Sequence, residues 1–384
     1  MTNIDYNIRK IISENSYITI DDFIKNSMHI HRESYYQNTK HIGDKGDFIT
    51  SPEISQLFNE TIALWIINKW EKAQKPSSFN LYELGSGKGT LISSILDIIN
   101  NISKGCYDAI DNIYILDINN YFIARQKFKL LKHINNNSKK IKWLKSYKDI
   151  TKTIKIETKD YYQDTRQTNS KISIVIANEF FDALPIKQYI KFNNKWFERV
   201  IKIKENQQYF FDKIIIQEKL ELFFKNTYIN AKDGACIEES PESIELSSIL
   251  ANLICKQKGA IIIIDYGYMI EPAKRNKNQF NPTLQAIYQH KYSSVTDNIG
   301  TSDLSAHVDF YQLITSFIRN KLLPNSIYYS SQSDFLKSYF IEKRARILID
   351  KNITYKDIIT RQLDRLISNQ QMGNLFKTLE VESL

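Results

Sequence analysis

The sequence predicts a Rossmann-like α/β fold, in which helices cover both faces of a mostly parallel sheet. Three observations support this. Short apolar runs alternate with segments of helical period between residues 81 and 181. These runs are nearly continuous in Ile, Val and Leu, which is typical of strands buried on both faces in a parallel sheet. A glycine-rich loop, residues 85–89, lies between the first run and a helix.

Each element of this fold has its own local signal. The apolar runs predict strands at 81–84, 113–118, 141–147 and 172–181. The helical period predicts helices at 91–100 and 121–134, with loops at 104–112 and 135–140. Farther along, residues 196–217 alternate like two antiparallel strands around a turn, 241–257 form an amphipathic helix, and 259–268 form another buried strand.

The region before the first strand is expected to be mostly helical. Its second helix covers residues 51–70, with Ser51 as the N-cap and Pro52 at the first helical position. A Gly- and Asp-rich loop, 41–50, precedes it. We therefore divide the chain into an N-terminal helical segment, 1–78, and an α/β domain, 79–384. The domain carries an insertion at about 190–235 and a lid or loop region at about 270–305.

The composition is that of a soluble globular protein, with 42% apolar and 25% charged residues. No run approaches the ~18 apolar residues that a membrane helix needs, so no membrane insertion is expected. The acidic residues Asp5, Glu14 and Asp21 argue against a transit peptide, and no secretory pattern opens the sequence. Three cysteines without a CxxC pair favour a reducing compartment and no metal site. We expect a bacterial cytoplasmic protein.

The formal net charge of +9 has two interpretations. It could mark a surface for nucleic acid or an acidic partner. Alternatively, it reflects lysines on solvated faces. The lysines are spread along the whole chain, which favours the second interpretation. Nucleic acid is therefore not the expected partner.

The strongest local signal is the loop that begins at Glu83 and ends at Thr90. A phosphate-binding P-loop would need glycine at position 82, where this chain has Tyr82, and a carboxylate beside the loop would repel phosphate. The alternative is the loop of a class I methyltransferase, an acidic residue followed by three alternating glycines. Its ligand is S-adenosylmethionine, whose ammonium group a carboxylate can help to place. The corresponding residues are Glu83, Gly85, Gly87, Gly89 and Thr90.

Asp117 lies at the end of the second predicted strand, where Rossmann-like sites place an acid that accepts the ribose hydroxyls. It could equally be a residue that caps the strand end. The fourth strand ends in Asn178, Glu179, two phenylalanines and Asp182. Ligands bind beyond the carboxyl ends of such strands, and paired carboxylates suit a planar guanidinium. The alternative is that Asn178 and Asp182 only cap a turn and the following helix.

These residues lie in strings that resemble the MidA-like methyltransferases, and the resemblance covers nearly the whole chain. The strings are GDFITSPEISQLFNE, LYELGSGKGTL, ANEFFDALPIKQY followed by WFERV, ESP at 239–241, IIDYGY, TLQAIYQH, TSDLSAHVDF and MGNLFKTL. Two positions depart from the family pattern: Ser86 stands where proline is usual, and Asn59 where glycine is frequent.

The resemblance implies a class I core, S-adenosylmethionine as cofactor, and a protein arginine as acceptor. Mitochondrial members methylate arginine and assist assembly of respiratory complex I, so a hydrophilic core subunit of that complex, symmetrically dimethylated, is the expected substrate. GDFITSPEIS resembles the segment over the cofactor, which adds Phe48, Ser51 and Glu53 as contacts. Residues 43–50 are expected to close as a lid. His307, Asp309 and Tyr266 resemble other signature positions and are expected in the pocket wall.

Two further functions fit parts of the sequence. A methyltransferase acting on RNA or a small molecule would suit the basic charge. A non-catalytic assembly chaperone would keep the fold without the chemistry. The intact glycine loop and the polar turn after the fourth strand argue against the chaperone, because a scaffold needs neither.

Overall fold

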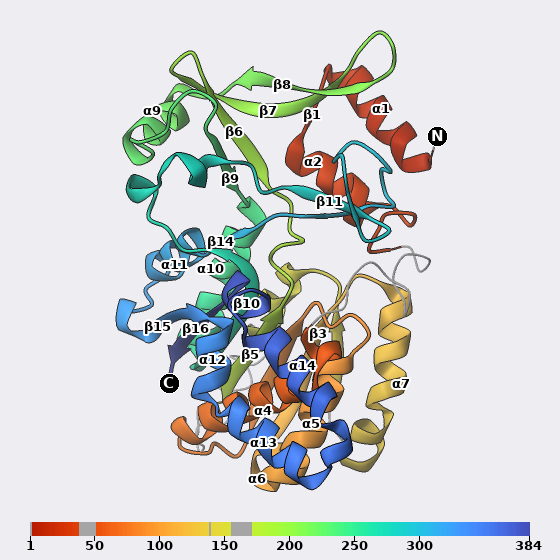
Figure 1. Cartoon of the computed structure of the whole chain (residues 1–384), viewed down its shortest axis with the longest axis vertical. Coiled ribbons are helices and arrows are strands. Elements are labelled where there is room, and N and C mark those ends of the chain that lie inside the picture. Colours follow the sequence, from red (N-terminus) through yellow and green to blue (C-terminus); the bar gives the residue numbers. More distant parts are fainter. Residues whose placement is uncertain (1, 38–50, 138–139, 155–170) are drawn as a thin grey trace. The chain divides into compact units, whose positions relative to one another are not determined.

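The computed structural model describes residues 2–37, 51–137, 140–154 and 171–384. The chain forms two compact units, each built from segments that are far apart in the sequence. Unit 1 contains 1–48, 182–245 and 268–313, and unit 2 contains 49–181, 246–267 and 314–384. Figure 1 labels most of their helices and strands.

Unit 2 is built on a twisted sheet with strand order β15-β16-β10-β5-β2-β3-β4. The five strands from β10 to β4 are parallel, whereas β16 is antiparallel to both β10 and β15. The strands are β2 Phe79–Leu84, β3 Ile110–Leu116, β4 Lys140–Leu144, β5 Ile172–Asn178, β10 Gly259–Tyr268, β15 Ile327–Ser331 and β16 Phe376–Ser383. This confirms the predicted α/β class.

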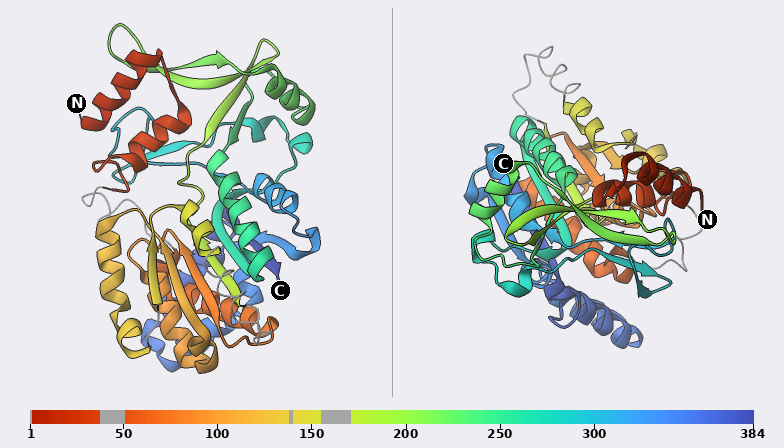
Figure 2. Two further views of the ribbon diagram at one scale, coloured as in Figure 1. Left: turned by 180° about the vertical axis from the view of Figure 1, so that it is seen from behind. Right: turned by 90° about the horizontal axis from the view of Figure 1, so that it is seen from above.

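Helices cover both faces of this sheet, because alternate side chains of its strands point to opposite sides. Ile174 and Ile262 pack in one cluster with residues of α4 and α5, and α10 lies over the other face (Figure 2). The helices are α3 Ser51–Ile54, α4 Gln56–Lys72, α5 Thr90–Ile102, α6 Lys104–Ala109, α7 Asn120–Asn137, α10 Pro241–Gln257, α11 Phe310–Arg319, α12 Gln332–Ser338, α13 Ile341–Lys351, α14 Lys356–Ile367 and α15 Met372–Leu375.

Three local predictions were wrong. The segment 104–112 is not a loop, because it forms α6 and then enters β3. Helix α7 continues to Asn137 instead of ending near residue 134. Ser51 is the first residue of the short helix α3 rather than a cap, and a break at Ser55 separates α3 from α4. The Ser55 hydroxyl accepts a hydrogen bond from the Leu57 N–H at 3.2 Å, which makes Ser55 the N-cap of α4.

Helix α4 belongs to unit 2. Its Trp65 donates an indole hydrogen bond of 2.7 Å to Glu380 on β16, and the buried Lys69 ammonium pairs with Glu380 at 2.9 Å and with Glu382. Helices α1 and α2 belong instead to unit 1. The helices before residue 78 are thus shared between the two units, and the partition at residues 78 and 79 stays a prediction.

Unit 1 contains a sheet of order β1-β7-β6-β9, with β8 paired to β7, and a small sheet of order β12-β11-β13. The hairpin of β7 and β8 confirms the antiparallel strands expected at 196–217. The elements of unit 1 are α1 Asn3–Asn15, β1 Ile18–Thr19, α2 Ile20–Lys25, a π-helix Asn26–Ile30, β6 Lys187–Phe192, β7 Lys195–Ile203, β8 Tyr209–Ile215, α9 Glu218–Thr227, β9 Cys236–Glu239, β11 Gln285–Tyr288, β12 Lys291–Ser293, β13 Asp303–Ser305 and β14 Val308–Asp309.

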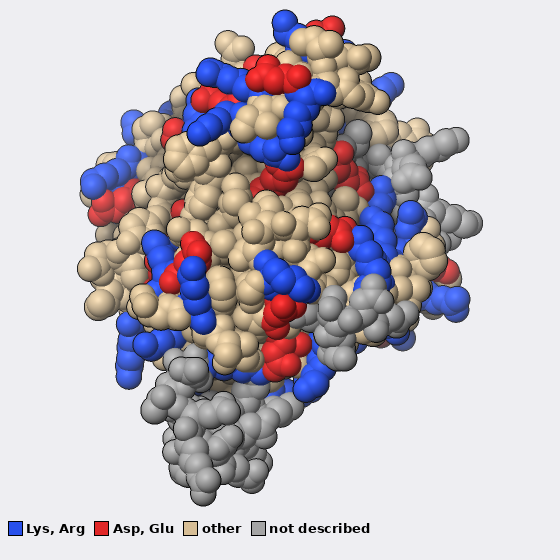
Figure 3. Space-filling view, turned by 90° about the horizontal axis from the view of Figure 1, so that it is seen from below, with Lys and Arg blue, Asp and Glu red and all other residues tan. Residues whose placement is uncertain are grey.

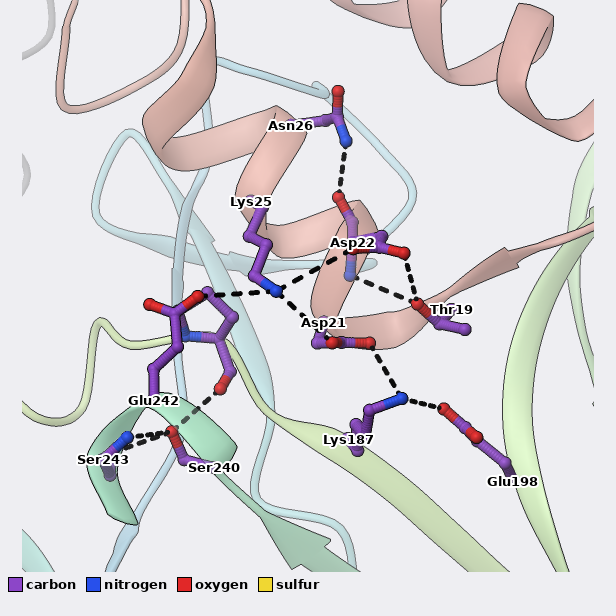
Figure 4. Close-up of polar contacts among 11 residues, drawn as sticks. Thr19, Asp21, Asp22, Lys25, Asn26, Lys187, Glu198, Ser240, Glu242 and Ser243 are labelled. Atoms are coloured by element: carbon purple, nitrogen blue, oxygen red, sulfur yellow. Dashed lines mark hydrogen bonds and ion pairs between the residues drawn. The ribbon is translucent and has the colours of Figure 1, made fainter. Parts of the chain in front are cut away.

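An ion-pair network ties α2 to the sheet of unit 1 (Figure 4). The Lys187 ammonium on β6 lies 2.7 Å from the Glu198 carboxylate and 3.6 Å from Asp21. Lys25 contacts Asp21 at 3.5 Å and Glu242 at 3.4 Å. Because Asp21 is 7% exposed, its charge needs these cations close by. The network therefore fixes where the N-terminal helices pack.

Charges of both signs are mixed on the face of the molecule in Figure 3. Among the described residues drawn there, Lys and Arg side chains alternate with Asp and Glu, without one continuous basic area. None of the helices in the described ranges is long and apolar enough to cross a membrane.

Candidate functional site

The glycine loop follows β2 at the carboxyl edge of the unit 2 sheet. Gly85 and Gly87 have φ values of +73° and +50°, which residues with a Cβ rarely adopt. A Cβ on Gly85 would lie 2.7 Å from the Phe180 ring, whereas a Cβ on Gly87 would meet no atom within 4 Å. The loop is therefore packed at Gly85 and has open space at Gly87, where a ligand can approach the backbone.

The Glu83 carboxyl lies beneath this loop and is 3% exposed. It accepts a hydrogen bond from the Ser86 hydroxyl. Burial raises the pKa of Glu83 to about 7; Asp117 adds to this rise, while Ser86 and Lys129 oppose it. A cationic ligand group would favour the ionised form, which fits the predicted contact with an ammonium.

Asp117 follows β3 directly and is 8% exposed. Its Oδ1 accepts a hydrogen bond of 2.8 Å from the Asn119 N–H, and its Oδ2 accepts one of 2.7 Å from the Gln126 amide. Burial raises the pKa of Asp117 to about 6, against the lowering effect of these two hydrogen bonds and of Lys145. Each oxygen keeps acceptor capacity for a ligand hydroxyl. Gln126 was not predicted as a site residue, because a glutamine within an amphipathic helix gives no sequence signal for ligand binding.

The turn after β5 holds Glu179 in an uncommon backbone conformation. Its φ is +51°, a region that a side-chain-bearing residue enters only when its surroundings require it. The Glu179 N–H donates to the Ile264 carbonyl at 2.9 Å. Its carboxylate Oε1 accepts hydrogen bonds from the Ser51 N–H at 3.0 Å and from the Asn178 amide at 3.2 Å. Strain of this kind is frequent at functional sites.

Asp265 on β10 fixes the same turn from the neighbouring strand. Its Oδ2 accepts hydrogen bonds from the N–H groups of Phe180 and Phe181, at 3.2 Å and 3.0 Å. Its Oδ1 accepts one of 3.0 Å from the Tyr266 N–H. Asp265 is fully buried. Asp265 was not among the site residues predicted from the sequence, although an acidic residue directly after four isoleucines was a visible signal.

The same turn also contacts the glycine loop. The near contact between Gly85 and the Phe180 ring places the polar end of β5 beside the loop after β2. The buried Asn178 Oδ1 has no hydrogen-bond partner among the described residues. A buried acceptor of this kind usually finds a partner, so this atom can receive a ligand donor.

The other predicted cofactor contacts have the following positions. Ser51 touches Glu179 through its N–H, and Glu53 forms an ion pair of 3.1 Å with Lys88 in the glycine loop. Thr90 is the first residue of α5, and its hydroxyl accepts a hydrogen bond of 2.8 Å from the Lys129 ammonium. Phe48 and the proposed lid, 43–50, lie outside the described residues. The roles given to these residues stay predictions.

Asp182 lies just beyond the unit boundary and begins a segment of unit 1. Its carbonyl accepts a hydrogen bond of 3.0 Å from the Ala306 N–H. Its expected pairing with Glu179 over a guanidinium stays a prediction.

The three other signature residues, Tyr266, His307 and Asp309, lie in different environments. Tyr266 packs edge-on against Phe376, with 5.6 Å between ring centroids. The His307 N–H donates to the Thr283 hydroxyl at 2.9 Å. Asp309 forms an ion pair with Arg275, which is 1% exposed and lies 5.1 Å from the centroid of the Tyr268 ring. This pair anchors the 270–283 segment within unit 1.

The fold and this site together define a class I S-adenosylmethionine-dependent methyltransferase. The features are a left-handed glycine loop after the first parallel strand, acidic side chains at the ends of the first and second, and a polar turn after the fourth. The open space beside Gly87 and the acceptors at Glu83 and Asp117 suit a ligand with an ammonium group and ribose hydroxyls. The described residues contain no group of three metal-ligating side chains.

Comparison with known proteins gives the family. Residues 61–322 match the family described as "Putative S-adenosyl-L-methionine-dependent methyltransferase", and this chain belongs to it. The chain is 30% identical over 376 residues to "Protein arginine methyltransferase NDUFAF7, mitochondrial" of Xenopus tropicalis, covering 95% of this chain and 82% of that protein. The relative of the same name in Homo sapiens is 27% identical, over 94% of this chain and 78% of that protein.

A solved structure confirms the fold. The crystal structure of a "likely methyl transferase" from Burkholderia thailandensis, bound to S-adenosyl-homocysteine, matches with a TM-score of 0.82 at 19% identity. The match covers 99% of this chain and 92% of that one. The MidA-like assignment and the class I fold, both expected from the sequence, are therefore confirmed, and S-adenosylmethionine is the cofactor of the family.

Proposed function

We propose that this chain methylates the guanidinium group of an arginine side chain in a protein. The observation that carries the proposal is Glu179, held at φ +51° beyond β5 with its carboxylate oriented by the Ser51 N–H and the Asn178 amide. A fixed carboxylate is the group that recognises the planar donors of arginine. The relatives named as protein arginine methyltransferases support the same acceptor.

The residues divide the work between cofactor and substrate. Glu83 and Asp117 would hold the ammonium and ribose ends of S-adenosylmethionine, which supplies an electrophilic methyl group on a sulfonium. Glu179 would orient the guanidinium, balance its charge and hold one nitrogen toward that methyl group. That nitrogen would gain the methyl group and give up one proton, which the Glu179 carboxylate would accept, and S-adenosylhomocysteine would be the leaving group. Positioning supplies much of the rate in such a transfer.

The finer identity of the substrate is also a proposal. The MidA-like resemblance favours symmetric dimethylation of a hydrophilic core subunit of respiratory complex I. A cytoplasmic location is proposed with it, because three cysteines without a CxxC pair suit a reducing compartment. Mass spectrometry of the host's complex I subunits, with and without this protein, would identify the methylated arginine. Methylation found only on RNA or on a small metabolite would replace this acceptor class.

The decisive variant is Glu179→Gln, which keeps the shape of the side chain and removes its charge. We expect binding of S-adenosylmethionine to be retained in titration calorimetry, because Glu83 and Asp117 are unchanged. Methyl transfer should fall by about 100-fold, the scale of one electrostatic contact in an active site. Glu242→Gln in unit 1 makes the same chemical change in an ion pair with Lys25 and should leave transfer unchanged. Full activity in Glu179→Gln would make Glu179 a structural residue.

A further inference from the structure

The buried Gln126 side chain joins the glycine loop to Asp117. Gln126 lies on α7 and is 0% exposed. Its amide nitrogen donates to the Gly87 carbonyl and to Asp117 Oδ2, both at 2.7 Å. Its amide oxygen accepts a hydrogen bond of 2.8 Å from the Trp143 indole on β4. One side chain therefore contacts the segments after β2 and β3 and the strand β4.

The three partners leave the amide only one orientation. The Trp143 indole nitrogen is a donor only, so it requires the amide oxygen. The Gly87 carbonyl and the Asp117 carboxylate are acceptors, so they require the two hydrogens of the amide nitrogen. All hydrogen-bonding capacity of the nitrogen is used, and a rotated amide would oppose acceptor to acceptor on the Asp117 side. The network is thus self-consistent and rigid.

Close packing holds this geometry in place. A Cβ on Gly89 would lie 3.0 Å from Gln126 Cγ and 3.3 Å from its Cα. The third glycine of the loop therefore lets α7 approach closely enough for the Gln126 amide to reach both acceptors. Gly89 and Gln126 form a matched pair that the spacing of the motif does not reveal.

We propose that Gln126 is a positioning residue for the cofactor: it orients the Asp117 carboxylate toward the ribose hydroxyls and fixes the Gly87 carbonyl. The inference rests on the cofactor site and not on the identity of the methyl acceptor. It therefore survives if arginine methylation is not found. Because Gln126 acts through Asp117 and Gly87, its removal should change how the protein distinguishes ligands, and not only how tightly it binds them.

The pH dependence of ligand binding gives a second measure of the role of Gln126, because charged groups surround Asp117. Glu83 faces it from the end of β2, and Lys145 faces it from the segment after β4. The hydrogen bond from Gln126 lowers the pKa of Asp117. Its loss should raise that pKa above about 6, and a protonated carboxyl can offer fewer acceptor sites to the ribose. The loss of ligand affinity that accompanies protonation of Asp117 should then occur at a higher pH than in the wild type.

The test compares S-adenosylhomocysteine with its 2′-deoxy analogue by titration calorimetry on the full chain. For Gln126→Leu we expect affinity for S-adenosylhomocysteine to fall by about tenfold, the scale of one hydrogen bond to a charged group. The deoxy analogue should lose clearly less, so the ratio of the two affinities should shrink. The lower of the two pH steps in binding, which belongs to Asp117, should move to higher pH in the same variant.

A second variant guards against misfolding. Trp143→Phe keeps an aromatic ring and removes only the indole donor, so one of the three hydrogen bonds that fix the Gln126 amide is lost. It should shift the affinity ratio in the same direction by a smaller factor. Equal losses for both ligands in both variants, or no loss in either, would overturn the proposal and leave Gln126 as a packing residue.

Discussion

The contrast between Gly85 and Gly87 gives a quantitative test of the loop geometry. Both have positive φ, at +73° and +50°, so Gly→Ala at either position should cost roughly 1–2 kcal/mol for the left-handed backbone. Only at Gly85 would the new Cβ meet an atom, Phe180 Cδ2 at 2.7 Å. Overpacking of this kind costs typically 1–3 kcal/mol, so Gly85→Ala should be the less stable variant by about that amount.

Urea unfolding of the ligand-free protein measures this difference, with Gly87→Ala as the matched control. Binding should show a separate effect, because the Cβ of Gly87→Ala enters the open space assigned to the ligand. Its affinity for S-adenosylmethionine should fall although its stability is the better of the two. The larger Gly87→Val should abolish binding. Equal unfolding free energies for the two alanine variants would refute the contact with Phe180, and normal binding by Gly87→Ala would refute the assigned ligand path.

Two further predictions concern ionisable groups. Affinity for S-adenosylmethionine should fall as the pH drops below about 7, because protonation of Glu83 removes the partner of the ammonium, and further below about 6 as Asp117 protonates. Calorimetry at pH values across both pKa values measures these two falls in affinity. In Glu83→Gln the fall near pH 7 should be absent. An affinity that does not depend on pH would contradict the prediction. Arg275→Met should destabilise the fold by roughly 3–5 kcal/mol, because the buried Asp309 loses its cation. Adding Asp309→Asn should recover part of this loss in urea unfolding, and no recovery would show that packing dominates.

The sequence by itself determined the parts of this protein that depend on local pattern. Apolar runs bounded by turns located β2, β3 and β5, because a strand buried on both faces must be apolar throughout. Three glycines after an acid located the ligand loop, because only glycine adopts φ +73° without cost. Asp117 followed from its place at a strand end. The long family strings then gave the methyltransferase class.

Other features depended on contacts between segments far apart in the chain. The α1 and α2 helices belong to the same unit as the strands of residues 187–239. The sequence did not predict this, because an ion pair such as Lys187 with Asp21 leaves no pattern in the sequence spacing. The antiparallel strand β16, nearly at the end of the chain, lies beside β10.

The same limit applied within the site. Asp265 holds the Phe180 N–H from 85 positions away in the sequence, and Gln126 holds the Asp117 carboxylate from 9 positions away. The sequence identified Phe180 and Asp117 but not the residues that orient them. Periodicity reports which face of an element is buried, and motifs report which backbone is strained. Neither reports which buried polar group a side chain will meet, because the meeting depends on how strands and helices pack. Only the tertiary structure therefore decided which residues hold the predicted site residues in place.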